Sequence, residues 1–195
     1  MKNSKITRMT GIALLMAMVV VMQFITASIP PVSGFSISLV LIPIVLGAAI
    51  YGPKAGALLG LTFGVVVVIN CITGADAGGH MVFQANPILC IIVVLGKGVL
   101  AGFASGTVYN ALSKANGYIA MLLSAMVCPV VNTGTFVLCM LTFYKDVLAV
   151  WAGGGDIIAY IFSGLLLMNF VPELIINIIF SPAGYRILRA IQSKF

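Results

Sequence analysis

Long apolar segments alternate with short polar joints along the chain, and this pattern predicts six membrane-spanning helices. We expect them at residues 8–28, 39–50, 54–71, 86–112, 118–143 and 156–180. At 1.5 Å per residue, the first is long enough to cross a hydrocarbon core of about 30 Å, which favours a retained helix over a cleaved signal peptide. The second is short for a span, so we expect it to be tilted, kinked at Pro43 or shielded by protein.

Proline and glycine mark the joints between these segments. Residues 30–38 begin with two prolines and are expected to be an irregular outer segment. Residues 72–83 and 144–155 are rich in glycine and polar side chains, which predicts two further outer loops. Pro129 is expected to interrupt the fifth helix, and a basic tail is expected to follow Pro182.

The composition agrees with a membrane protein. Hydrophobic residues make up 62% of the chain and charged residues only 7%, against about 25% charged residues in soluble domains. We therefore predict an all-α integral membrane protein with a single domain over residues 1–195. The net charge of +6 does not indicate nucleic-acid binding, because the basic residues form no stripe interleaved with aromatic residues.

The basic residues predict the topology. Eight of the ten Lys and Arg residues lie at the two ends or in two joints that an even number of crossings would place on one side: Lys2, Lys5, Arg8, Lys54, Lys114, Arg186, Arg189 and Lys194. Since Lys and Arg accumulate in cytoplasmic loops, both termini are expected in the cytoplasm. Asp76, Asp146 and Asp156 then fall in the outer loops.

Two charged residues, Lys97 and Glu173, lie inside apolar segments. Lys97 comes eleven residues after Asn86, about 16 Å along a helix and therefore near the middle of the membrane. A cation there costs several kcal/mol unless water, an anion or a carboxylate compensates it. Lys97 therefore either pairs with Glu173 or other protein groups, or captures an anionic group of a substrate. We favour the second interpretation, because intramembrane charges are usually functional.

Several amides accompany this lysine. Asn132 and Asn169 each lie three residues from a proline, where the broken helical ladder frees carbonyl groups and favours a polar pocket. Asn70 ends the third helix on the outer side. Together with Lys97, these residues predict a pocket that is open toward the outside. Trp151, in the last outer loop, is either an interfacial anchor or a lid over a bound ligand.

Catalytic and metal-binding motifs are missing from the sequence. His80 is the only histidine, and no cysteine or second histidine stands at metal-ligand spacing from it. Gly96-Lys97-Gly98 is not a phosphate loop, because no Ser or Thr follows the lysine. Only four acidic residues are available for acid–base chemistry. We expect no enzymatic activity, no metal and no cofactor.

Small residues recur at four-residue spacing in three of the expected helices. Because positions i and i+4 share a helix face, such rows let another backbone approach closely. Two glycine rows are best explained by packing inside the protein, whereas the alanine row near the amino terminus is accessible to a separate subunit. The rows are Gly56, Gly60 and Gly64; Gly98, Gly102 and Gly106; and Ala13 and Ala17.

These features together resemble the substrate-binding (S) components of energy-coupling factor (ECF) transporters, in the riboflavin and pantothenate branch. The resemblance rests on the size, the six apolar segments and three motifs. The motifs are the AxxxA sequence Ala13-Leu14-Leu15-Met16-Ala17, the run from Asn86-Pro87 through Lys97 to Gly106, and Pro129-Val130-Val131-Asn132-Thr133.

The resemblance implies a protein of the bacterial cell membrane that binds a water-soluble vitamin from outside. Such a protein works with a transmembrane coupling subunit and two cytoplasmic ATPases, which use the ATP, and its Ala13 and Ala17 face meets the coupling subunit. The implied substrate-binding residues are Asn86, Lys97, Asn132, Asn169 and Trp151. Many relatives in the pantothenate-like branch have arginine where Lys97 falls, and lysine keeps the charge but loses the bidentate geometry.

Pantothenate is the first choice of substrate, because its carboxylate would compensate Lys97. Riboflavin, a B6 vitamer or another micronutrient remain open. Two other functions are also compatible with the residues: an autonomous small transporter coupled to ions through Glu173, and a structural membrane subunit in which Lys97 and Glu173 pair.

Overall fold

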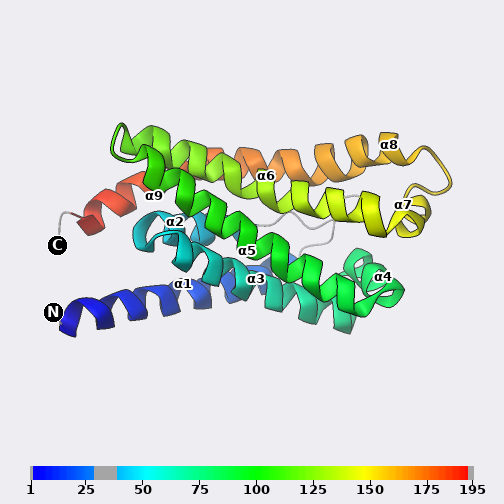
Figure 1. The fold of residues 1–195 in the computed structure, drawn as a ribbon, viewed down its shortest axis with the longest axis horizontal. Helices are drawn as coiled ribbons and strands as arrows, with labels where there is room; N and C mark the ends of the chain where they lie inside the picture. The colour runs from blue at the N-terminus through cyan, green and yellow to red at the C-terminus, as the bar shows by residue number, and fades with distance from the viewer. Residues whose placement is uncertain (1, 29–38, 193–195) are drawn as a thin grey trace.

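The computed structural model describes residues 2–28 and 39–192, and within these ranges every regular element is helical. The all-α prediction is therefore confirmed (Figure 1). In chain order the elements are α1 (Lys2–Ser28), α2 (Leu41–Tyr51), α3 (Pro53–Thr73), α4 (Ala77–Ala85), α5 (Pro87–Leu112), α6 (Gly117–Phe143), α7 (Lys145–Trp151), α8 (Ile157–Tyr160), the π-helix η1 (Ile161–Phe170) and α9 (Val171–Gln192).

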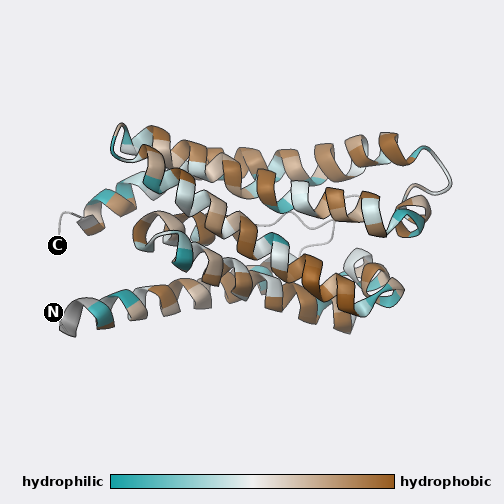
Figure 2. Cartoon of the chain, in the orientation of Figure 1, coloured by the Kyte–Doolittle hydropathy of each residue, from teal (hydrophilic) through white to brown (hydrophobic). Residues whose placement is uncertain are grey.

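Five helical segments in the described ranges are long and apolar enough to cross a membrane: Lys5–Thr26, Pro53–Thr73, Pro87–Leu112, Gly117–Phe143 and Ile157–Ile191. Hydrophobic residues follow these segments along most of their length (Figure 2). Their bounds agree with the expected helices to within a few residues, except at the carboxyl end.

The short helix α2 does not have the length of a membrane span, so the prediction of six full spans is not confirmed. Its 11 residues extend about 16 Å, roughly half of the hydrocarbon core. Most of its side chains are buried, and it contacts α1, α3, α5, α6 and α9. It is therefore shielded by protein, which was one of the alternatives expected for this helix beside a tilt and a kink at Pro43. Pro43 lies in its first turn, where proline is tolerated. The irregular segment expected at 30–38 lies outside the described residues.

Two of the expected outer loops contain helices, which corrects the prediction of irregular structure. Within 72–83, α3 ends at Gly74, whose left-handed backbone (φ 81°) suits glycine, and α4 begins soon after. The Asp76 carboxylate accepts a hydrogen bond of 3.1 Å from the Gly79 amide and caps α4. Within 144–155, α7 continues to Trp151. The glycines did not prevent a helix here, because a capped short helix at the end of the bundle is supported by its contacts with neighbouring helices.

Neither Pro129 nor Pro182 ends its helix, contrary to the expected interruption at Pro129, and the basic segment expected after Pro182 continues α9. Pro129 lies inside α6, and α9 continues through Pro182 to Gln192. A proline lacks the N–H that would bond the carbonyl four residues earlier. At Pro182 that carbonyl belongs to Ile178, and the Ser181 hydroxyl donates to it at 2.8 Å instead. The side chain therefore replaces the bond that the proline removes.

The two glycine rows pack α3 against α5, which confirms the packing interpretation. A methyl group on Gly60 would collide with the carbonyl oxygen of Gly98, and one on Gly102 would collide with that of Gly56. The backbones of α3 and α5 are thus too close to leave room for a side chain at these glycines. This contact fixes α5, and therefore Lys97, relative to α3.

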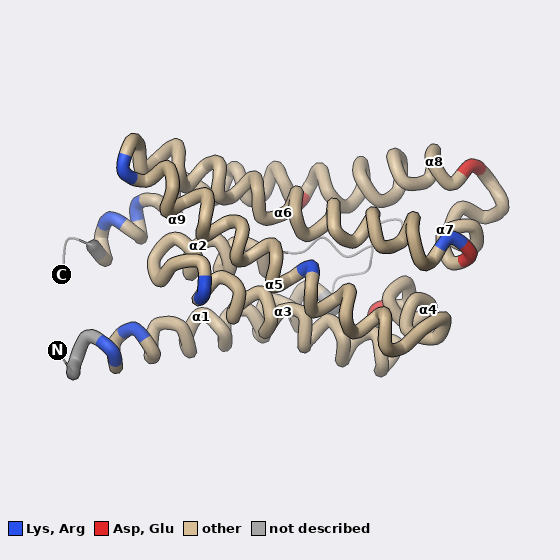
Figure 3. Tube along the Cα trace, in the orientation of Figure 1, with Lys and Arg blue, Asp and Glu red and all other residues tan. Residues whose placement is uncertain are grey.

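Charged side chains divide the molecule into two ends (Figure 3). The beginning of α1 and the end of α9 lie at the same end, together with most of the basic residues. The acidic residues of α7 and of the cap of α8 lie at the opposite end, Asp146 on α7 and Asp156 before α8. This separation matches the charge pattern from which a cytoplasmic position of both termini is expected.

Candidate functional site

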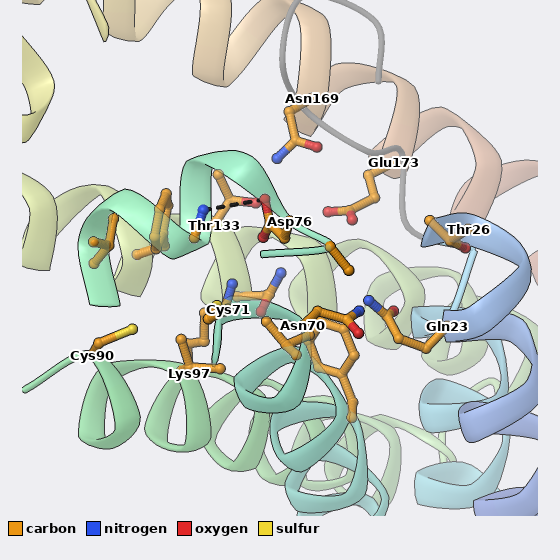
Figure 4. A pocket seen from close by; sticks show the side chains of 18 of the residues that line it. Gln23, Thr26, Asn70, Cys71, Asp76, Cys90, Lys97, Thr133, Asn169 and Glu173 are labelled. Carbon is orange, nitrogen blue, oxygen red and sulfur yellow. Dashed lines mark hydrogen bonds between the residues drawn. The ribbon is translucent and has the colours of Figure 1, made fainter. Parts of the chain in front are cut away.

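A polar cavity lies inside the helical bundle, with residues of α1, α3, α5, α6, η1 and α9 in its walls. The space between these walls is about 980 Å³, which includes space open to solvent. Figure 4 shows its polar side chains converging from different helices. Those polar side chains are Gln23, Thr26, Asn70, Asp76, Lys97, Asn132, Thr133, Asn169 and Glu173.

Four of the five expected binding residues line this cavity: Lys97, Asn132, Asn169 and Trp151. The fifth, Asn86, is absent from the cavity lining and caps α5, where its side chain accepts a hydrogen bond of 3.2 Å from the Leu89 amide. The polar pocket predicted from an intramembrane lysine and nearby amides is therefore present, and it also contains Asn70.

Lys97 is held far from both ends of α5. It lies ten residues after Pro87, the first residue of the helix, which corresponds to about 15 Å. Its Nζ atom is 4.8 Å from the ring centroid of Phe136 and 5.9 Å from that of Phe63. The two rings stabilise the cation through their π faces. This contact leaves the ammonium N–H donors for an acceptor in the cavity.

Four buried acceptor atoms surround the same space. The side-chain oxygens of Gln23, Asn132, Thr133 and Asn169 have no hydrogen-bond partner among the described residues. Leaving such an atom unsatisfied costs about 1–3 kcal/mol. Since Asn132 and Thr133 are only 6% and 4% exposed, bulk water cannot freely satisfy them. The arrangement suits a solute that brings several hydrogen-bond donors.

Glu173 contributes a second buried charge to the cavity. It is 2% exposed and lies four residues after Asn169, so both side chains project from the same face of the helical segment. In Figure 4 they come from one wall, while Lys97 and Asn70 come from another. The π-helix η1 contains Asn169 and ends just before Pro172, and π-helical turns are frequent at functional sites.

The end of the cavity that lies away from the chain termini is formed by α4 and Trp151 (Figure 1). Asp76, Gly79 and Val82 line it from α4 and its cap. Gly78 faces the Trp151 ring, which is 3.5 Å from the position that a β-carbon on this glycine would take. His80, which falls in the outer loop expected at 72–83, instead lies on α4, with Nδ1 2.7 Å from the Cys71 carbonyl oxygen. In the described part of the chain, no cluster of His, Cys, Asp and Glu is suited to a metal.

Several residues of the cavity were missed from the sequence. Gln23 and Thr26 lie three positions apart in an apolar segment, so their shared face was a signal that could have identified them. Phe63 and Phe136 gave no such signal, because phenylalanine is common throughout membrane helices. Their role depends on the approach of Lys97 from another helix.

The two alanines expected to meet a coupling subunit are exposed on α1. Ala13 and Ala17 face outward, whereas Leu15 and Val19 of the same helix are buried against the bundle. A small-residue surface on α1 is therefore available for close helix packing.

A family model matches most of the chain. The model of the family described as "ECF transporter, substrate-specific component" matches residues 7–184. A search of the curated proteins found no match. The matched range contains α2 to η1 complete, and all the residues named above in the cavity. The chain therefore belongs to the family of substrate-specific components of ECF transporters.

Proposed function

We propose that this S component binds pantothenate from outside the bacterial cell membrane and delivers it with a coupling subunit and two ATPases. The observation that carries the proposal is the Lys97 ammonium, which faces a polar cavity from the middle of α5. A carboxylate is the ligand group that best compensates such a cation.

The rest of the cavity is compatible with the other groups of pantothenate. Its amide N–H and hydroxyl groups offer donors to the buried oxygens of Asn132, Asn169 and Gln23. Riboflavin and the unphosphorylated B6 vitamers carry no anionic group and would bring no anion to Lys97. They remain the alternative substrates, and Trp151 at the cavity lining is a candidate lid for any of them.

Energy would come from the partner proteins, because the lysine of Gly96-Lys97-Gly98 belongs to no phosphate loop. ECF family membership implies association with the coupling and ATPase modules. Ala13 and Ala17 are the proposed contact with the coupling subunit, since both are small and exposed on α1. The basic end of the bundle, with both termini, would face the cytoplasm and the ATPases.

Reconstitution into liposomes tests this function. The purified chain alone should bind radiolabelled pantothenate and accumulate none inside the vesicles. Accumulation should require the coupling subunit, both ATPases and ATP. Uptake by the chain alone under a pH gradient would contradict the proposal and favour an autonomous ion-coupled transporter. Absence of pantothenate binding would contradict the choice of substrate, and mass spectrometry of the solute retained after gentle purification would then identify another.

A further inference from the structure

The charges in the cavity do not suit a ligand that is only an anion. Lys97 contributes one positive charge, while Asp76 and Glu173 contribute two negative charges. Asp76 is committed to the cap of α4, where it accepts from Gly79. Glu173 is 2% exposed, so water screens it poorly, and a second carboxylate near it would be repelled. An anionic group can bind next to Lys97 only if the remainder of the ligand suits Glu173.

Two amide side chains, those of Asn169 and Gln23, line the same cavity as Glu173. Asn169, one helical turn earlier, and Gln23, on α1, each have a buried oxygen without a partner among the described side chains and backbone. In Figure 4 the side chains of Asn169 and Glu173 point toward the same space. A ligand group placed there gains most if it donates hydrogen bonds, because a bond to a carboxylate is about twice as strong as one between neutral groups.

We infer that Glu173 is a specificity-determining residue that accepts hydrogen bonds from hydroxyl groups at the end of the substrate opposite its anionic group. The inference rests on the proposed function and narrows it to a class of substrate: an elongated molecule with an anion at one end and hydroxyl donors at the other. Lys97 selects the first end and Glu173 selects the second.

A conservative substitution can separate this role from a structural one. Asn177 donates its hydrogen bond of 2.8 Å to the backbone carbonyl of Glu173, not to the carboxylate. Glu173→Gln keeps that bond and the side-chain volume while it removes the charge. Asp146→Asn is the matched control, because Asp146 is exposed on α7 and does not line the cavity.

Three probe molecules distinguish the contributions of the two ends of the ligand to binding. Pantothenate has both the carboxylate and the hydroxyl groups. Panthenol keeps the hydroxyl groups but replaces the carboxylate with an alcohol. N-(3,3-dimethylbutanoyl)-β-alanine keeps the carboxylate but lacks the hydroxyl groups. Isothermal titration calorimetry measures the dissociation constant of each probe for the wild-type chain, Glu173→Gln and Asp146→Asn, with thermal unfolding as the check on folding.

The expected result is a loss confined to probes with hydroxyl groups. Glu173→Gln should weaken pantothenate and panthenol by about tenfold each and leave the hydroxyl-free probe unchanged, while Asp146→Asn alters none of them. Equal loss for all three probes, or no loss, would overturn the inference and leave the proposed function standing. Failure of the wild-type chain to bind pantothenate would instead overturn the proposed substrate, and the assignment of the two ends with it.

Discussion

Two aromatic rings lie next to the Lys97 ammonium. The Phe136 and Phe63 centroids are 4.8 and 5.9 Å from Nζ. Such contacts contribute about 0.5–2 kcal/mol each, which offsets only part of the cost of several kcal/mol for a cation inside the membrane. The remaining cost can be met by an acceptor that enters the cavity. In the proposed function, the substrate would supply this acceptor to the N–H donors of Lys97.

Asn86 was expected to bind substrate, and its position suggests that it stabilises α5 instead. Asn86→Ala should lower the free energy of unfolding by about 1 kcal/mol, because the cap to Leu89 is lost. The dissociation constant for pantothenate should change less than about twofold, since this substitution removes no group that lines the cavity. Thermal unfolding and calorimetry measure the two effects.

The control for this prediction is Asn116→Ala, which removes the equivalent cap from α6. It should lower stability similarly and spare binding. A loss of affinity above tenfold in Asn86→Ala alone would restore Asn86 as a binding residue. The neighbouring bond from the Tyr144 hydroxyl to the Asn86 carbonyl, 3.0 Å long, does not depend on the Asn86 side chain. Burial raises the pKa of Tyr144 to about 12, so this hydroxyl keeps its proton and its bond at physiological pH.

Trp151 is the only tryptophan in the chain and lines the cavity, so its fluorescence should report ligand binding. We expect addition of pantothenate to change the emission intensity or maximum with a saturable dependence on concentration. Trp151→Phe should abolish the signal, while calorimetry should still detect binding. A saturable calorimetric signal in the wild-type chain with unchanged fluorescence would contradict the position of Trp151 over the ligand.

Among single residues, the sequence identified the polar side chains that are unusual in an apolar helix. Lys97, Asn132 and Asn169 were predicted because such residues are costly in lipid and need a reason. The aromatic partners of Lys97 were not predictable, because nothing distinguishes Phe63 and Phe136 from other membrane phenylalanines. Asn86 was placed correctly at the start of a helix, but a cap and a ligand contact have the same sequence signature.

At the scale of elements, long helices followed from hydrophobic length, whereas short ones did not. The bounds of α3, α5 and α6 were predicted to within a few residues, because a span of lipid demands a fixed length of helix. The helices α4 and α7 were missed because capping and local contacts, rather than length, decide whether a short segment folds. The π-helix η1 was missed for a related reason: its five-residue bonds, such as that from Val171 to the Leu166 carbonyl, leave no periodic signal in an apolar sequence.

The close packing of α3 on α5 predicts how substitutions of their glycines change stability. Gly60→Leu should unfold the protein or lower its melting temperature strongly, because the side chain would collide with the Gly98 carbonyl. Gly96→Ala, one residue before Lys97 on the same helix, should be neutral or stabilising by up to about 1 kcal/mol, since the added methyl group meets no atom within 4 Å. Fluorescence-detected thermal unfolding in detergent measures both. Equal stability of the two variants would contradict the close contact.

At the scale of the molecule, one end is basic, the other carries Asp146 and Asp156, and a polar cavity lies between them (Figure 3). The separation of charges was predictable from the sequence, because Lys and Arg accumulate in the short loops on one side of a membrane. The number of full spans was not, because α2 is apolar like a span but is only half as long and is buried by its neighbours. Apolar side chains suit both burial by protein and burial in lipid, so the sequence of α2 does not distinguish the two.

The proposed assembly predicts that bulky side chains on the exposed face of α1 prevent contact with the coupling subunit. Ala13→Trp and Ala17→Trp should prevent close helix packing and abolish co-purification with the coupling subunit, while pantothenate binding is preserved, because both residues face away from the bundle. Leu138→Trp is the control, since Leu138 is 66% exposed on α6, away from the alanine row. Assembly that survives in both alanine variants would show that another surface meets the coupling subunit.

The most direct test is equilibrium binding of radiolabelled pantothenate to the wild-type chain, Lys97→Met and Lys114→Met in detergent. Methionine keeps an unbranched side chain between the two rings, so Lys97→Met should remain folded. Its affinity should fall roughly 10- to 100-fold, as expected for the loss of a charged hydrogen-bond donor. Lys114→Met, which is exposed in the joint between α5 and α6, should retain wild-type affinity. Unchanged affinity in Lys97→Met would contradict the proposed binding of an anionic substrate group by Lys97.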